Sequence, residues 1–92
     1  MHYIVKVRDW LTPRASAVCS ARAFALLRAD EGKWQTCVLR YKSLEDARRY
    51  VRSALNRKVT RPMDEAFVRD FRIFVQDGRK QSLVEETLAN RE

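Results

Sequence analysis

One amphipathic segment, residues 43–57, constrains the fold of this chain more than any other feature. It reads SLEDARRYVRSALNR, and at about 100° per residue its apolar side chains occupy an arc of about 140°. Ser43 and Asp46 have the spacing of a capping box, and Glu45 and Asp46 lie in the first turn, where the helix dipole favours acids. The sequence therefore predicts a helix over 43–57 whose apolar stripe is covered by a sheet.

The chain has 92 residues, too few for two separate cores, since a second core needs roughly another 50 residues. Its hydrophobic fraction of 46% is enough for one globular core. We therefore expect residues 1–92 to form a single compact domain.

Three segments have the character of strands. HYIVKV, at the start of residues 2–8, alternates in side-chain type with a period of two. Residues 34–41 and 70–76 are rich in β-branched and aromatic side chains, and the last run ends at the turn pair Asp77-Gly78. The pattern predicts strands over these three ranges.

Two further helices are expected near the C-terminus. Pro62 and the acids after it favour a short helix over 62–69. Ser82 and Glu85 have capping-box spacing, which predicts a helix over 82–90.

Residues 13–31 allow two interpretations. Pro13, the alanines and Gly32 favour a helix over 13–31. The arginines fall among the alanines on a helical wheel, however, so no clean apolar face results. Because Gly32 can supply a turn, a hairpin of strands 21–29 and 34–41 is the preferred prediction. The fold class is then α+β: a small antiparallel sheet of three to four strands with two or three helices packed on one face.

The sequence has no recognisable catalytic or cofactor-binding set. His2 is the only histidine and lies next to the first residue, which disfavours Ser-His or Cys-His catalysis. Cys19 and Cys37 lack metal-ligand spacing, and we expect them to be reduced and buried. Gly32 and Gly78 cannot form a phosphate-binding loop. We expect no enzyme activity, cofactor, metal or small-molecule substrate.

The net charge of +7 is unevenly distributed along the chain. Residues 1–42 carry +5 and residues 43–62 carry +4, whereas residues 63–92 carry −2. Such a field favours nucleic acid, an acidic protein surface or a ribonucleoprotein as partner. No apolar run approaches the roughly 18 residues of a membrane span or forms a signal peptide, so we expect a cytoplasmic protein with no membrane partner.

The candidate binding residues are the cations on the back of helix 43–57 and just after it, together with two aromatic residues beside turns. Guanidinium groups match phosphate geometry, and an exposed ring can stack on a base or anchor an interface. Two other readings stay open, a solvated helix face and rings packed on their own sheet. The candidates are Arg48, Arg49, Arg52, Arg57, Lys58, Arg61, Trp34 and Tyr41.

The order of three strands followed by SLEDARRYVRSAL resembles the C-terminal half of a double-stranded-RNA-binding domain. Ala47, Val51 and Ala54 would form the core face of that family's helix. The sequence departs from the family at the start of this helix, where paired lysines are replaced by Glu45 and Asp46.

The chain also resembles, in format, small phage-encoded anti-CRISPR proteins: a single α+β domain of about ninety residues with the unit LLRADEGKWQTCVLRYKSLEDARRYV and no catalytic apparatus. That family has no common motif, so no functional residue is carried over. The resemblance implies a stoichiometric inhibitor that docks on a CRISPR effector in the host cytoplasm and blocks guide or target access. Since this chain is basic, it would contact guide RNA or an acidic protein surface.

These observations give two hypotheses. The first is a non-enzymatic protein directed at a ribonucleoprotein, most concretely an anti-CRISPR inhibitor. The alternative is a free RNA- or DNA-binding module that uses the basic face of helix 43–57.

Overall fold

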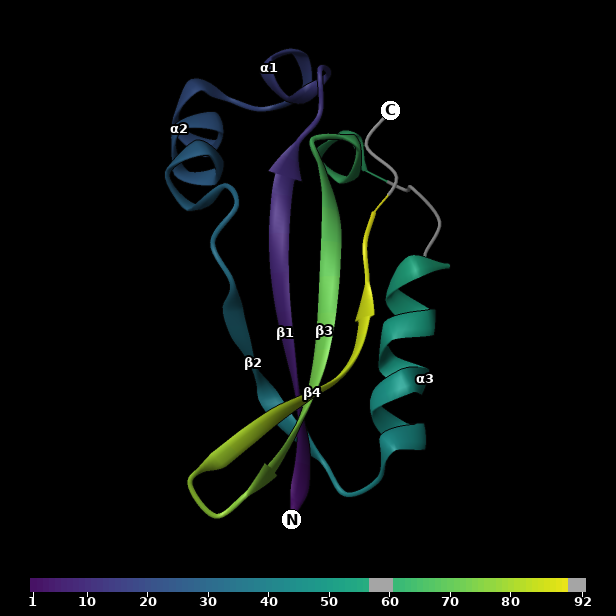
Figure 1. Cartoon of the computed structure of the whole chain (residues 1–92). Helices are drawn as coiled ribbons and strands as arrows, with labels where there is room; N and C mark the ends of the chain where they lie inside the picture. The colour runs from purple at the N-terminus through teal and green to yellow at the C-terminus, as the bar shows by residue number, and fades with distance from the viewer. Residues whose placement is uncertain (57–60, 90–92) are drawn as a thin grey trace.

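A computed structural model of the protein describes residues 1–56 and 61–89 and has a four-stranded antiparallel sheet in the order β2-β1-β3-β4 (Figure 1). The strands are β1 (His2–Leu11), β2 (Gln35–Tyr41), β3 (Phe67–Asp77) and β4 (Lys80–Thr87). The helices are α1 (Ala15–Val18), α2 (Ala21–Asp30), α3 (Leu44–Leu55) and a single 3-10 turn, η1 (Pro62–Glu65). The predicted α+β class with an antiparallel sheet is confirmed.

The two long central strands, β1 and β3, pair continuously from His2–Gln76 to Leu11–Phe67. Side chains alternate between the two faces of this pair, as the two-residue period of a strand requires. Val5 and Val7 lie opposite Ile73 and Phe71, and all four are buried in one core cluster. The predicted strands 2–8 and 70–76 are thus confirmed, and both extend further than predicted.

Helix α3 crosses from β2 to β3 and packs on the sheet face that carries the core. Ser43 caps it, and its hydroxyl oxygen accepts a hydrogen bond from the Asp46 backbone N–H at 3.2 Å. Ala47 and Val51 are buried, while Leu55, at the end of the predicted stripe, is 49% exposed. The predicted capped helix with a core-facing stripe is confirmed.

The preferred prediction of a strand over 21–29 is wrong, because this segment forms helix α2. The Ser20 hydroxyl caps α2 by accepting a hydrogen bond from the Ala23 N–H at 3.2 Å. None of its residues is buried, so the missing apolar face was no evidence against a helix. Alanine's high helix propensity decides the conformation here. Predicted strand 34–41 is confirmed as β2, but it pairs with β1 instead of with 21–29.

The predicted helix over 82–90 is also wrong, because most of this segment belongs to β4. Asp77 pairs with Lys80 across a tight turn in which Gly78 has φ +63°. The Asp-Gly pair was recognised as a turn signal, and such a turn joins two hairpin strands. The predicted short helix over 62–69 is reduced to η1, and β3 already begins at Phe67.

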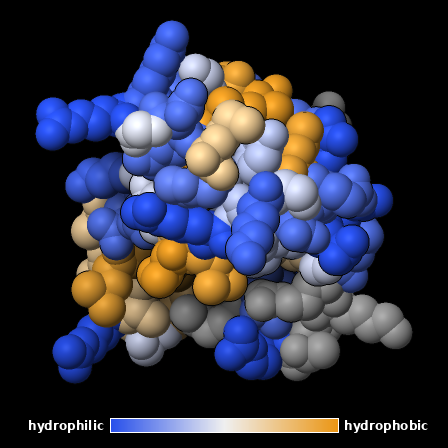
Figure 2. Space-filling view, turned by 90° about the horizontal axis from the view of Figure 1, so that it is seen from below, coloured by the Kyte–Doolittle hydropathy of each residue, from blue (hydrophilic) through white to orange (hydrophobic). Residues whose placement is uncertain are grey.

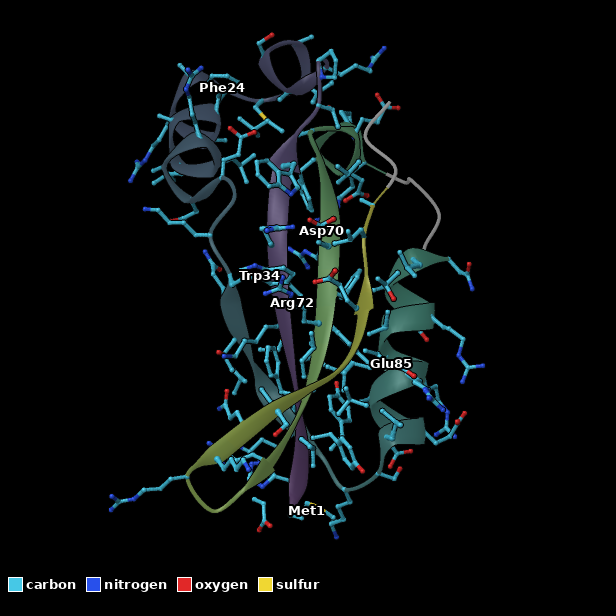
Figure 3. The ribbon with its side chains drawn as sticks, viewed as in Figure 1. Met1, Phe24, Trp34, Asp70, Arg72 and Glu85 are labelled. Carbon is cyan, nitrogen blue, oxygen red and sulfur yellow. The ribbon has the colours of Figure 1, made fainter. Side chains whose placement is uncertain are left out.

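The sheet face opposite α3 carries alternating aromatic and guanidinium groups. The Arg8 guanidinium lies 5.1 Å from the Trp10 ring and 4.4 Å from the Trp34 ring, and Arg72 lies 4.2 Å from Trp34. Figure 3 shows Trp34 and Arg72 beside each other over β1. These contacts hold the segment before β2 against the central strands.

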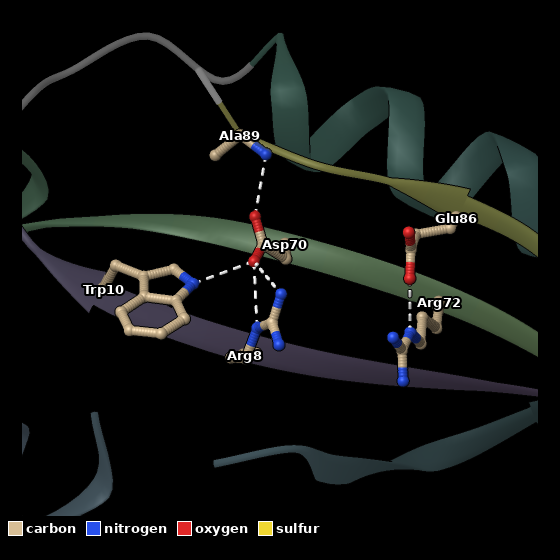
Figure 4. Close-up of polar contacts among 6 residues, drawn as sticks. All are labelled: Arg8, Trp10, Asp70, Arg72, Glu86 and Ala89. Carbon is tan, nitrogen blue, oxygen red and sulfur yellow. Dashed lines mark hydrogen bonds and ion pairs between the residues drawn. The ribbon is translucent and has the colours of Figure 1, made fainter. Parts of the chain in front are cut away.

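Beneath this row lies Asp70, the one buried charged residue in the described part of the chain. Its carboxylate accepts hydrogen bonds from Arg8, from the Trp10 indole N–H and from the Ala89 backbone N–H, each at 2.8–2.9 Å (Figure 4). Asp70 thereby connects β1 and β3 with the segment after β4.

Gly32 makes room for this arrangement between α2 and β2. It has φ +77°, and a Cβ at this position would lie 3.1 Å from the Trp10 ring. Only glycine combines a positive φ at little strain with so close an approach. The Gly32 N–H also donates to the Asp9 carbonyl oxygen at 2.9 Å, which fixes the turn.

Cys19 and Cys37 are both reduced, as expected, but they are half-buried rather than fully buried. In the described part of the chain, no helix has the length and apolar character of a membrane span.

Candidate nucleic-acid interface

A shallow groove that combines positive charge with aromatic rings lies where β2 ends and α3 begins. It has a volume of about 480 Å³. Figure 2 shows the end of the molecule seen from below, where hydrophilic side chains cover most of the surface and apolar side chains form separate patches. We call the groove between the end of β2 and the start of α3 the basic groove. It is lined by Arg40, Tyr41, Lys42, Asp46, Arg49, Tyr50 and Ser53.

The two elements place their tyrosines together. Tyr41 ends β2, where it pairs with Tyr3 of β1, and Tyr50 lies on the side of α3 that faces β2. Their ring centroids are 6.0 Å apart with a tilt of 33°. Tyr50 also contacts the Phe71 ring edge-on at 6.4 Å, so core packing fixes its orientation. The aromatic part of the groove is therefore held in place by the core.

The register of β2 contributes to this geometry. Ile4 pairs with Arg40 and Lys6 with Thr36, so three residues of β2 lie opposite the single Val5 of β1. A bulge of this kind re-aims the side chains beyond it. Here the residues beyond the bulge, Arg40 and Tyr41, line the basic groove.

Three cations line the groove together with the rings. Arg49 pairs with Asp46 at 3.3 Å, whereas no carboxylate among the described residues pairs with Arg40 or Lys42. The nearest polar partner of Arg40 is the His2 ring, at 3.3 Å between Nη1 and Nε2. With three cations and one acid, the lining has a surplus of two positive charges.

The tyrosine hydroxyls remain neutral at physiological pH. Partial burial, followed by the neighbouring Cys37 thiol, raises the pKa of Tyr41. Burial raises the pKa of Tyr50 as well, with a further contribution from Cys37, whose Sγ lies 4.0 Å from the hydroxyl oxygen. Two neutral phenols beside three cations suit an anionic ligand that carries flat rings.

The opposite flank of α3 has a different character. A depression of about 360 Å³ between α3 and β4 contains two arginines and two glutamates, with an apolar floor that includes Val51. Arg48 pairs with Glu85, and Arg52 pairs with Glu45 at 2.7 Å. The hydrogen bond from Arg48 lowers the pKa of the Glu85 carboxyl. This flank is electrically balanced.

The candidate residues predicted from sequence are therefore distributed over several places. Tyr41 and Arg49 meet in the basic groove, whereas Arg48 and Arg52 lie on the balanced flank. Arg61 follows α3 in the chain and pairs with Asp64 at 3.3 Å.

Trp34 lies on the far sheet face, where its ring contacts Arg8 and Arg72. The predictions for Arg57 and Lys58 fall outside the described residues. Sequence reasoning missed Arg40, Lys42 and Tyr50 as members of a site. The available signal was the run Arg-Tyr-Lys directly before a capped helix, which places two cations around a ring.

Within residues 1–56 and 61–89, no three His, Cys, Asp or Glu side chains gather as a metal-binding group. Comparison with known proteins found no matching family model, no similar curated protein and no similar solved structure. Function is therefore inferred from the geometry and charge of the basic groove.

Proposed function

We propose that this chain is a non-enzymatic binding protein that docks on a ribonucleoprotein and contacts its RNA through the basic groove. The observation that carries the proposal is the surplus of two positive charges around two fixed tyrosine rings. Arginine and lysine pair with RNA phosphates, and aromatic side chains stack on bases. An acidic protein surface would satisfy the cations alone, whereas RNA offers phosphates to the cations and bases to the half-buried rings.

The most concrete form of this proposal is a phage-encoded inhibitor of a CRISPR effector complex. The protein would bind the guide RNA or the effector surface beside it and block access to guide or target. A small basic domain suits this task, because its positive field speeds association with a nucleic-acid-loaded complex.

The proposal is tested by affinity capture with purified CRISPR effectors, each loaded with guide RNA, together with a plaque assay on cells that carry the same systems. We expect the wild-type protein to retain a loaded effector and to protect phage. The variant R40Q/K42Q/R49Q, which keeps the helix but removes the groove cations, should lose both properties. Absence of association and of protection for the wild-type protein would remove this form of the proposal.

A second candidate function is a module that binds free RNA or DNA. It is favoured by the fact that the groove unites cations and rings within one chain, so a protein partner is not needed to complete it. The sequence-based version of this idea used the basic face of α3, whose Arg48 and Arg52 are paired with acids. A gel-shift titration with free RNA and DNA, beside the capture experiment, distinguishes a free binder from a protein that needs the assembled complex.

A further inference from the structure

We infer that the basic groove takes a single unpaired nucleotide of RNA, with its base against the tyrosine rings and the adjoining phosphates at the cations. This inference rests on the proposed function and specifies the form of RNA that the groove recognises. It follows from the arrangement of the rings, the cations that line the same groove and the size of the groove.

The rings offer a platform that is ordered before any ligand binds. Tyr41 is fixed by β-pairing with Tyr3, and Tyr50 by its contacts with Tyr41 and Phe71. A rigid ring loses little conformational freedom on binding, so stacking contributes more of its energy to affinity. The 33° tilt between the rings means that a base would stack on one ring and contact the second at an angle.

This platform excludes a base that remains in a duplex. In A-form RNA the faces of the bases are covered by their neighbours, and a protein reaches only the backbone and the groove edges. A tyrosine can stack only on a base that has left the helix, as in a loop, a bulge or a single-stranded end. Duplex RNA could contact the cations but would leave the rings unused.

The cations stand next to the rings in the chain. Arg40 and Lys42 flank Tyr41 at the end of β2, and Arg49 precedes Tyr50 on α3. Each of the two elements that carry a ring therefore also carries a groove-lining cation, which suits a base with adjoining phosphates. The volume of about 480 Å³ lies in the range of about 300–1,000 Å³ for small-ligand pockets. That size is enough for one nucleotide.

The test is a fluorescence-anisotropy titration with a labelled 12-nucleotide single-stranded RNA and with the same RNA annealed to its complement. We expect the wild-type protein to bind the single strand at least about 10-fold more tightly than the duplex. Tyr41→Leu should weaken binding to the single strand about 5- to 100-fold, which is the effect of removing one stacked base, and should change duplex binding little. Tyr41→Phe keeps the ring and should bind like the wild type.

Equal affinity for single strand and duplex, or unchanged single-strand affinity in Tyr41→Leu, would overturn the inference. The wild-type comparison does not depend on whether Tyr41→Leu folds, and a thermal melt of that variant identifies a loss caused by unfolding. If the loaded effector is captured but shows no requirement for unpaired RNA, only this inference fails. If neither RNA nor effector binds, the proposed function fails with it.

Discussion

At the scale of single residues, Asp70 is the side chain whose environment is most demanding. It is fully buried and accepts hydrogen bonds from Arg8 and Trp10 of β1 and from Ala89 after β4. A carboxylate removed from water is tolerated only when its charge is paired and its oxygens are hydrogen-bonded. Asp70 therefore holds β1, β3 and the segment after β4 together on the sheet face opposite α3.

We predict that Asp70→Asn lowers the free energy of unfolding by about 3–5 kcal/mol, because it leaves the largely buried Arg8 guanidinium without its counter-charge. The measurement is equilibrium unfolding in urea.

The matched control is Glu86→Gln, which breaks the more exposed Arg72–Glu86 pair of the same sheet face (Figure 4). Exposed pairs contribute about 1 kcal/mol or less, so this variant should stay close to the wild type. Equal losses in the two variants would show that the burial of Asp70 is not what matters.

At the scale of elements, the sequence correctly predicts the helices and strands whose signals lie entirely within the element itself. Helix α3 has a cap, first-turn acids and a stripe of the right period, and strands β1 and β3 alternate or carry β-branched residues throughout. Each of these signals acts within one element, so it can be read without knowing the neighbours.

The two wrong predictions concern elements whose conformation depends on context. Helix α2 lies at the periphery and buries no residue, so a test that looks for an apolar stripe rejects it. Strand β4 carries a Ser–Glu spacing that imitates a capping box, but the two-residue turn at Gly78 pairs it with β3 instead. Tertiary pairing overrides the local signal in β4.

The candidate site was predictable only in part for a related reason. Tyr41 and Arg49 were identified by their residue types, but their proximity depends on how β2 runs into α3. The ion pair between Arg48 and Glu85 joins residues 37 positions apart, so the sequence could not show that Arg48 is already partnered. Basic residues can be counted from sequence, whereas their pairing cannot.

The contact between α3 and β4 makes a prediction about pH. The pKa of Glu85 is lowered in the folded protein, mainly by the hydrogen bond from Arg48, so the folded state favours the carboxylate form. Glu85 therefore stabilises the fold at pH values above its ordinary pKa of 4.5, and this contribution is lost as the pH falls below that value toward the lowered pKa.

We expect Glu85→Gln to reduce the free energy of unfolding modestly at pH 7 and to have a shrinking effect as the pH is lowered from 5 to 3. Unfolding in urea at a series of pH values measures this difference. Arg48→Gln removes the partner and should give the same pH profile. A constant difference between wild type and Glu85→Gln over this range would contradict the assigned role.

At the scale of the whole molecule, the distribution of charge matters more than its amount. The chain carries a net charge of +7, yet much of its arginine is paired with acids on the same surface. In the basic groove, positive charge exceeds the local acid and lies beside aromatic rings. A general field attracts any polyanion, whereas a groove of this kind fixes where it binds.

The central claim, that the basic groove binds RNA, is tested most directly by the salt dependence of RNA affinity in two triple variants of equal charge. R40Q/K42Q/R49Q removes the groove cations, and R48Q/R52Q/R61Q removes the arginines that are paired elsewhere. Each variant lowers the net charge from +7 to +4. In a plot of log K against log salt for single-stranded RNA, each lost phosphate contact reduces the slope by about 0.7. We predict that the groove variant loses a slope of about 1.4, for the two phosphates beside the bound nucleotide, while the second variant keeps that of the wild type. Equal changes in both would contradict the claim.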